Sequence, residues 1–310
     1  MQVSRKILVT GAGGFIGKVL LKSLADLPFD IHALVRRFDH AMSPAITQHV
    51  SRDLLTIGQD DLRQAMTGAH CLIHLSAVVP GKNTNSEINA TVEIARIIAA
   101  AAANAKIDRV IVMSSVYAEL AEREDPKARR YGHDKLAADE IFTNYLPKPN
   151  VIFLRPPVVY GSAMRGSLQI LAKLISQGVW LPLGLARNER SYISITNLVN
   201  LLQHLVALDD TRWQVAQGQR YVPTDGAPVS TVELINTIAA SLGVVPRLIP
   251  FPPSALRLIG RLVGQSEMIS GAFDALPFND NDRLLRDFRW VPVETFPQSH
   301  AIWERRILIP

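Results

Sequence analysis

The chain has almost no cysteine and few aromatic residues. Cys71 is the single cysteine among 310 residues, which excludes an intrachain disulfide framework and a zinc site built on cysteines. It lies in an apolar stretch, which favours a buried packing role. Aromatic residues make up 6% of the chain and hydrophobic residues 48%. We therefore expect a large and mostly aliphatic core.

A dense run of basic residues, a long apolar stretch and a histidine cluster are also missing. The net charge is +5 and the pI is about 9.4. Because the basic residues are dispersed, nucleic-acid binding is not indicated, whereas an anionic small-molecule ligand suits the sign. No apolar run can span a bilayer, and Met1 stands too close to the first apolar run for a signal peptide. We expect a soluble cytoplasmic protein, and we predict no metal site.

The first half of the chain alternates short apolar runs with helical patterns. Strands are predicted at Ile7–Val9, Ile31–Val35, Cys71–Leu75, Val110–Met113 and Val151–Leu154. Helices are predicted at Phe15–Leu24, Asp60–Met66, Ser86–Ala105 and Tyr131–Tyr145. This alternation predicts an α/β fold with a doubly wound parallel sheet of the Rossmann type. Ligands of such folds bind at the carboxyl ends of the strands.

After Gly161 the alternation stops and prolines become frequent. Helical patterns continue at Leu168–Ile175, Asn197–Leu205, Thr231–Leu242 and Ser254–Leu262. We predict a dinucleotide-binding domain at 1–160 and a smaller, mainly substrate-binding domain at 161–310. The two are expected to interleave, because Tyr192–Ile195 and Arg220–Val222 have the pattern of strands that return to the first domain.

A glycine-rich turn follows the first predicted strand and opens the first predicted helix. It reads Thr-Gly-Ala-Gly-Gly-Phe-Ile-Gly over residues 10–17. Gly11 permits a tight turn, Gly14 lets a pyrophosphate approach the backbone, and Gly17 lets the helix pack closely on the strand. The backbone around Phe15 and Ile16 would then present N–H groups at a helix N-terminus, where an anion is favoured. This arrangement predicts dinucleotide binding.

Two further motifs indicate hydride transfer. Ser115 ends the strand that contains Val110–Met113, and Tyr131 and Lys135 stand four residues apart at the start of a predicted helix, so they share one face. A nearby ammonium lowers the pKa of a phenol, which would let Tyr131 exchange a proton with a substrate hydroxyl or carbonyl. Lys135 could also hold a nicotinamide ribose, and Ser115 could hold the substrate oxygen.

With these motifs the chain resembles the extended short-chain dehydrogenase/reductase superfamily, in its nucleotide-sugar epimerase and dehydratase branch. The resemblance covers nearly the whole chain and implies that Ser115, Tyr131 and Lys135 form the active site. It also implies that Arg190 binds a substrate diphosphate, for which a bidentate guanidinium is suited. The further positions that it places at the cofactor are Asp53, Leu54, Leu75, Ser76, Ala77 and Pro157.

The end of the second predicted strand bears on the choice of cofactor. NAD-dependent enzymes carry an acidic residue there for the ribose 2′-hydroxyl, whereas this chain has Arg36 followed by Arg37. An arginine can hold the 2′-phosphate of NADP, so NADP(H) is favoured over NAD(H). The alternative is that Arg36 stacks on the adenine and that either cofactor binds.

The residues after Ser115 narrow the reaction. Sugar 4,6-dehydratases of the resembled family carry an Asp-Glu pair there, whereas this chain has Val116 and Tyr117. Dehydration is therefore disfavoured. We expect hydride transfer at C4 of a nucleotide-diphosphate sugar, in either a 4-keto-sugar reduction or a UDP-hexose 4-epimerisation. The alternatives are an NADPH-dependent carbonyl reductase with a non-sugar substrate and a non-catalytic dinucleotide sensor. The resemblance also predicts a homodimer that pairs the helices at Ser86–Ala105 and Tyr131–Tyr145.

Overall fold

The computed structural model describes residues 4–77, 87–146, 150–161, 167–262 and 273–296. Two compact units form within the chain. Unit 1 comprises residues 1–156, 199–222 and 282–290, and unit 2 comprises residues 157–198, 223–281 and 291–310. Across the described residues, none of the helices combines the length and the apolar composition that a membrane crossing requires.

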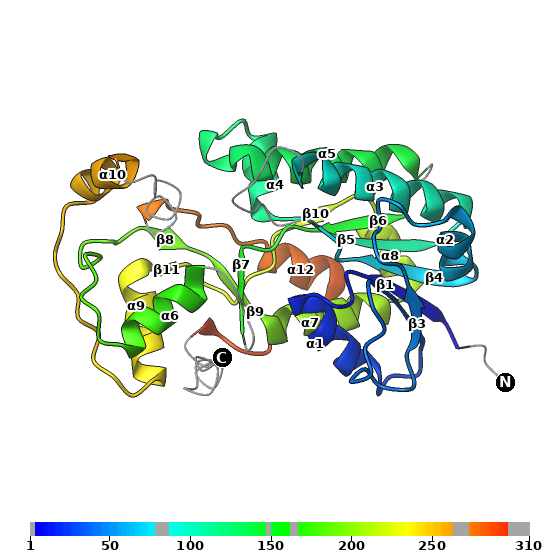
Figure 1. Cartoon of the computed structure of the whole chain (residues 1–310), viewed down its shortest axis with the longest axis horizontal. Coiled ribbons are helices and arrows are strands. Elements are labelled where there is room, and N and C mark those ends of the chain that lie inside the picture. Colours follow the sequence, from blue (N-terminus) through cyan, green and yellow to red (C-terminus); the bar gives the residue numbers. More distant parts are fainter. Residues whose placement is uncertain (1–3, 78–86, 147–149, 162–166, 263–272, 297–310) are drawn as a thin grey trace. The chain divides into compact units, whose positions relative to one another are not determined.

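Unit 1 is built on one seven-stranded parallel sheet, in the order β10-β6-β5-β4-β1-β2-β3 (Figure 1). Its strands are β1 (Lys6–Thr10), β2 (Asp30–Val35), β3 (Thr47–Val50), β4 (Ala69–His74), β5 (Arg109–Met113), β6 (Val151–Leu154) and β10 (Arg220–Tyr221). The order reverses between β1 and β4, and open α/β sheets bind ligands at such a switch point. The predicted doubly wound fold is confirmed.

Helices cover both faces of this sheet (Figure 1). On one face lie α2 (Gln59–Met66), α3 (Glu87–Asn104), α4 (Val116–Glu122), the short 3-10 helix η1 (Pro126–Ala128) and α5 (Arg129–Tyr145). The other face carries α1 (Phe15–Leu24), α7 (Ile195–Val206) and α12 (Asn281–Phe288). The central strands β1, β4, β5 and β6 are buried on both sides and are rich in Val, Ile and Leu, as is typical of parallel strands. Ser86, which was predicted to begin the third helix, lies outside the described residues.

The core between the sheet and the α2–α3–α5 layer is aliphatic, as expected from the composition. It contains Leu8, Leu72, Val110 and Val112 from the strands, and alanines of α3 fill the space between them. Cys71 is buried in β4. Burial raises the pKa of its thiol to about 12, so the predicted packing role fits its surroundings.

Segments from the second half of the chain complete unit 1. Strand β10 pairs with β6 in parallel, with Arg220 opposite Phe153. In α7, Gln203 donates to the carbonyl of Ser23 in α1 at 2.9 Å, and the His204 ring lies 2.7 Å from the carbonyl of Phe288 in α12. The helix α8 (Asp210–Ala216) also belongs to this unit.

Unit 2 contains two small sheets. Strand β7 (Val158–Tyr160) pairs with β9 (Tyr192–Ser194), and β8 (Glu189–Arg190) pairs with β11 (Val229–Ser230). Its helices are α6 (Ser167–Ser176), α9 (Thr231–Ser241) and α10 (Pro253–Leu262). Unlike the expectation for Tyr192–Ile195, β9 pairs with β7 inside unit 2 and not with the large sheet. Arg220–Tyr221 pairs with β6 in the large sheet, as β10.

A buried carboxylate organises the β7–β9 sheet. Asp225 is 4% exposed. It accepts hydrogen bonds from the Tyr160 hydroxyl at 2.6 Å, the Asn197 amide at 2.6 Å and the Ser194 backbone N–H at 2.9 Å. Burial raises the pKa of Asp225, and these donors oppose that shift. This network could not be predicted from the sequence, because its members lie in separate segments.

Candidate active site

The glycine turn lies where the sheet order reverses. Gly11 adopts φ +69°, and a Cβ at this position would stand 2.7 Å from the backbone of Leu75 and Ser76 after β4. A Cβ on Gly17 would lie 2.5 Å from the Gly11 carbonyl oxygen. Neither contact is sterically acceptable, so glycine at both positions is required for the close approach of β1, β4 and α1.

The turn ends in a helix N-terminus without a side-chain cap. Gly14 is the N-cap residue of α1 and makes no side-chain cap hydrogen bond, so the first backbone N–H groups of the helix remain available to an anion. Phe15 and Ile16 form the first turn and are partly buried. Nearby, the Oγ of Ser76 is buried and has no hydrogen-bond partner among the described residues. Leu75 and Ala77 beside it are partly buried. These features suit a dinucleotide.

The end of β2 carries exposed arginines. Arg36 and Arg37 directly follow Val35 and are exposed. The next carboxylate along the chain, Asp39, has an oxygen 3.6 Å from the Lys18 ammonium of α1 and accepts a hydrogen bond from the Ala41 N–H. The charge available at the strand end is therefore positive.

Asp53 and Leu54 lie in the turn after β3. Asp53 is exposed and accepts a hydrogen bond from the Leu55 N–H at 3.0 Å, which is a common role for aspartate in a turn. Leu54 packs on the core of unit 1. Their expected place at the cofactor stays a prediction.

Ser115, Tyr131 and Lys135 come together at the carboxyl end of β5. Ser115 is the N-cap residue of α4 and its Oγ accepts from the Tyr117 N–H at 3.3 Å. The side chains of Ser115 and Tyr131 share a hydrogen bond. Lys135 is 6% exposed, and its ammonium donates to the carbonyl of Met113 at 3.0 Å. The hydroxyl, phenol and ammonium thus surround the end of one strand.

The acid–base properties of this group differ from the expectation. Burial raises the pKa of Tyr131 above its usual 10, and the hydrogen bond with Ser115 opposes the rise. The predicted lowering of that pKa by Lys135 is therefore wrong for the groups that the chain itself supplies. The Lys135 ammonium binds the Met113 carbonyl, and burial lowers its own pKa to about 8. With a pKa raised from 10, the Tyr131 side chain is a neutral phenol near neutral pH.

Two features of this region could not be read from the motif. Gly132 follows Tyr131, and a Cβ there would stand 2.3 Å from the Tyr117 carbonyl oxygen, so the close approach of α5 to the start of α4 requires glycine at this position. The Tyr117 ring also packs on the edge of the Tyr131 ring, with centroids 6.0 Å apart. Tyr117 thereby helps to hold the phenol in place.

Arg190 lies in unit 2. It is 5% exposed, so it is not a solvated surface arginine, and one of its terminal nitrogens lies 3.4 Å from the Asp274 carbonyl oxygen. Pro157, the first residue of unit 2, is buried. Among the residues that the structure describes, no three His, Cys, Asp or Glu side chains are grouped to hold a metal ion.

The sequence of about two thirds of the chain matches a known protein family. Residues 7–215 match the sequence model described as the NAD dependent epimerase/dehydratase family. The chain belongs to this family. The predicted superfamily resemblance is thereby confirmed, and the chain is an NAD(P)-dependent enzyme of the short-chain dehydrogenase/reductase type. The match ends at residue 215, so residues 223–281 and 291–310 of unit 2 lie outside it.

Individual family relatives are more distant. The chain is 26% identical to a UDP-glucose 4-epimerase of Vibrio cholerae, over 96% of this chain and 94% of the relative. It is 27% identical to a ceramide reductase of Caulobacter vibrioides, over 83% and 77%. Among solved structures, UDP-glucuronic acid 4-epimerase from Bacillus cereus in complex with NAD superposes with a TM-score of 0.70 at 16% identity, covering 96% of both chains. This last similarity supports the fold.

Proposed function

We propose that the protein transfers hydride at C4 of a nucleotide-diphosphate sugar, as a 4-epimerase or a 4-keto-sugar reductase. The observation that carries this proposal is the convergence of Ser115, Tyr131 and Lys135 at the end of β5, in a unit that also contains the glycine turn. The similarity along nearly the full chain to a UDP-glucose 4-epimerase supports the substrate class.

The chain's own residues suggest the following roles. Ser115 orients the reacting sugar oxygen. The Tyr131 phenol exchanges a proton with that oxygen as the C4 hydroxyl and the C4 carbonyl interconvert. Lys135 contributes a positive charge beneath them. Gly11, Gly14 and the first turn of α1 would hold the pyrophosphate of the cofactor. The nicotinamide, when bound, supplies or accepts the hydride.

Dehydration does not fit the site. In α4, the two residues after Ser115 are Val116, which is buried, and Tyr117, which packs on Tyr131. Neither is a carboxylic acid that could protonate a leaving hydroxyl. The first carboxylate of this helix is Glu119, and it is bonded to Arg155 and Arg123.

We further propose NADP(H) as the preferred cofactor. Arg36 and Arg37 are exposed where NAD-dependent enzymes place a carboxylate. The nearby carboxylate of Asp39 forms an ion pair with Lys18. A guanidinium attracts a 2′-phosphate and gives no comparable advantage to a 2′-hydroxyl. Arg190, which is buried in unit 2, is proposed to bind the substrate diphosphate.

The deciding experiment follows absorbance at 340 nm with NADPH or NADH and a UDP-4-keto sugar. A reductase consumes the cofactor stoichiometrically. An epimerase shows no net change but converts UDP-glucose or UDP-N-acetylglucosamine to its C4 epimer. We expect Tyr131→Phe to lower turnover by about 10²–10⁴-fold while cofactor binding stays within about twofold, because the phenyl ring keeps the packing on Tyr117.

A carbonyl reductase with a non-sugar substrate is the second candidate, and the similarity to a ceramide reductase favours it. NADPH consumption with a long-chain ketone, together with inactivity on all the nucleotide sugars, would establish this candidate and exclude the first. A Tyr131→Phe variant whose function is unchanged would instead indicate a dinucleotide sensor.

A further inference from the structure

A second buried carboxylate lies directly behind the proposed catalytic group. Asp139 stands one helical turn beyond Lys135 on α5 and is 0% exposed. Its Oδ2 accepts hydrogen bonds from the Ser114 hydroxyl at 2.9 Å and from two nitrogens of Arg155 at 3.1 and 3.0 Å. Burial raises the pKa of the Asp139 carboxyl group, and the Arg155 guanidinium, the Ser114 hydroxyl and the Lys135 ammonium oppose that rise. Two guanidinium N–H groups and a hydroxyl on one oxygen are donors that favour the ionised carboxylate.

Asp139 and Lys135 hold consecutive residues at the end of β5. The Lys135 ammonium donates to the Met113 carbonyl, and Asp139 accepts from the next residue, Ser114. Ser115 follows immediately. Two side chains on the same face of α5 therefore fix the backbone that places the Ser115 hydroxyl. The Asp139 contribution to this attachment depends on its carboxylate accepting the Ser114 hydroxyl.

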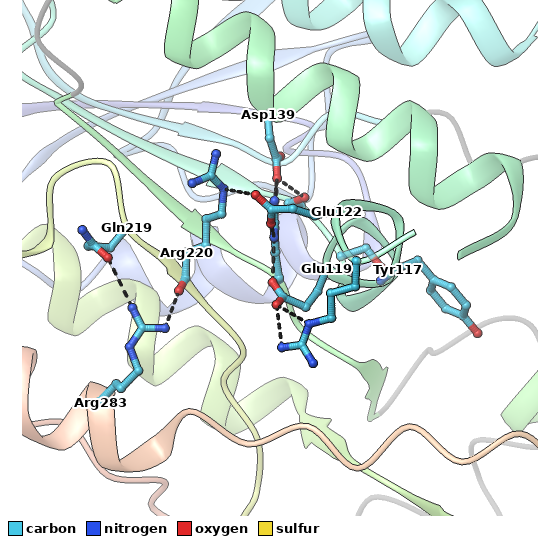
Figure 2. Close-up of polar contacts among 11 residues, drawn as sticks. Tyr117, Glu119, Glu122, Asp139, Gln219, Arg220 and Arg283 are labelled. Carbon is cyan, nitrogen blue, oxygen red and sulfur yellow. Dashed lines mark hydrogen bonds and ion pairs between the residues drawn. The ribbon is translucent and has the colours of Figure 1, made fainter. Parts of the chain in front are cut away.

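Arg155 does not depend on Asp139 alone. This arginine is also 0% exposed, and its third nitrogen donates to Glu119 at 2.7 Å and to Glu122 at 2.5 Å. Asp139, Glu122 and Glu119 all form ion pairs with Arg155. Figure 2 shows these three carboxylates close together, while the Tyr117 ring points away from them. Neutralising Asp139 leaves Arg155 with two carboxylates, so the charge of Arg155 stays compensated.

Within the described part of the chain, Asp139 is the one carboxylate whose charge raises the pKa of Lys135. Burial lowers the pKa of the Lys135 ammonium to about 8, and the field of Asp139 opposes that shift. The neighbouring titratable groups add little: His74 on β4 has a pKa of about 3 and is neutral, and Tyr131 is a phenol. The second oxygen of Asp139 accepts no hydrogen bond from the described residues. No hydrogen-bond donor among them therefore weakens the negative potential at that oxygen.

We propose that Asp139 is a positioning residue of the hydride-transfer site, which keeps Lys135 cationic and, through Ser114, fixes the end of β5 that carries Ser115. Its consequence for turnover rests on the proposed function. Its effect on the charge of Lys135 does not, and can be measured without substrate.

The test is an NMR titration of protein labelled with ¹³C at lysine Cε, in which the Lys135 signal is identified by its loss in Lys135→Arg. In the unmodified protein this signal should titrate near pH 8. In Asp139→Asn it should titrate at a pH lower by about half a unit or more. Asp139→Glu, which keeps the charge, should restore most of the difference.

Glu122→Gln is the matched control. It removes a carboxylate from the same arginine, but Glu122 contacts Arg155 and Arg220 and bonds neither Ser114 nor Lys135 in the structure. This variant should lower stability and leave the Lys135 titration unchanged. If Asp139→Asn does not fold, the double variant Asp139→Asn with Arg155→Gln removes both buried charges together, and its Lys135 should titrate at a lower pH than that of Arg155→Gln, which keeps Asp139.

With an active substrate, the alkaline limb of kcat should move to lower pH in Asp139→Asn and not in Glu122→Gln. An unshifted Lys135 signal in Asp139→Asn overturns the proposal, whatever the activity. A shifted signal in a protein that is inactive on every nucleotide sugar upholds the role of Asp139 and overturns the proposed substrate class. The two ideas can therefore fail separately.

Discussion

At the scale of single residues, His74 illustrates the effect of burial on a titratable side chain. It ends β4 at 4% exposure, its Nδ1 lies 2.8 Å from the Thr10 hydroxyl oxygen, and its ring contacts Phe142. Burial, aided by the charge of Lys135, lowers its pKa from 6.5 to about 3. The imidazole is therefore neutral in the folded protein across the physiological range.

This histidine should make the protein sensitive to mild acid. Below about pH 6.5 the unfolded chain binds a proton at His74 that the folded protein refuses until about pH 3, so stability falls as pH falls through that window. The loss amounts to about 2 kcal/mol at pH 5. Urea unfolding at pH 7 and pH 5 measures it.

His74→Gln provides the control, because an amide can bond Thr10 but does not titrate. Its free energy of unfolding should change less between pH 7 and pH 5 than that of the unmodified protein. Some slope will remain, since burial also lowers the pKa values of His49 and His70. Equal slopes in the two proteins would show that His74 takes up its proton before unfolding.

The same physics explains which site properties could be predicted from sequence. The Tyr131–Lys135 spacing and Ser115 at a strand end were enough to predict their convergence, because helix periodicity and strand direction are local rules. The direction of the Tyr131 pKa shift was predicted wrongly, because it depends on burial by segments distant in sequence. The buried contacts of Asp139 could not be predicted for a similar reason, because its partners Ser114 and Arg155 lie 25 and 16 residues away.

At the scale of secondary-structure elements, the junction of β1, β4 and α1 depends on missing side chains. Gly17→Ala would bring a Cβ to 2.5 Å from the Gly11 carbonyl oxygen and 2.7 Å from Ala12. Backbone on both sides prevents relief, so α1 must move away from the strand. We expect a loss of about 1–3 kcal/mol in unfolding free energy and weaker NADPH binding, measured by thermal unfolding and by fluorescence titration.

Gly13→Ala in the same turn is the control. It tests whether the destabilisation comes from steric crowding around the new Cβ or from the loss of any glycine in the turn. A Cβ at Gly13 meets nothing within 4 Å, and Gly13 has no positive φ. Its unfolding free energy should stay within about 0.5 kcal/mol of the unmodified protein. Comparable destabilisation in both variants would mean that the contacts around Gly17 do not limit the packing of α1.

Long apolar elements were predicted well and short polar ones were not. Strand β5 is buried throughout and β1 is buried after Lys6, and both appear in the sequence as runs rich in Val, Ile and Leu. The edge strand β3 reads Thr-Gln-His-Val, with no buried residue. In α12, only Leu284 and Phe288 are buried. Elements at the edge of a sheet or on its outer surface bury too few apolar residues to give a clear period.

At the scale of the whole molecule, chain connectivity departs most from the predicted boundaries. A break near residue 160 follows naturally from the change in composition, and the first compact segment of unit 1 does end at Pro156. Unit 1 nevertheless takes in residues 199–222 and 282–290. Periodicity identifies elements but not their partners. The sequence therefore predicted a short returning strand at the position of β10, but not its pairing with β6. The homodimer stays a prediction.

This interleaving leads to a prediction about fragments. A chain that ends at residue 160 keeps six of the seven strands that pair in the large sheet, yet it loses β10, α7 and α12. The Phe153 and Arg155 N–H groups would lose their acceptors, the Gln219 and Tyr221 carbonyls. One face of the sheet would also lose the apolar residues of α7, of which Leu201, Leu202 and Leu205 are 0% exposed.

We therefore expect the 1–160 fragment to lack a cooperative thermal transition and to bind a hydrophobic dye. Residues 1–156 joined through glycine–serine linkers to 199–222 and 282–290 restore these missing parts, and should unfold cooperatively and bind NADPH. Circular dichroism melting of both proteins makes the comparison. A cooperative transition in the 1–160 fragment would mean that β1 to β6 and their helices bury enough apolar surface alone, and that the later segments only add to an independent domain.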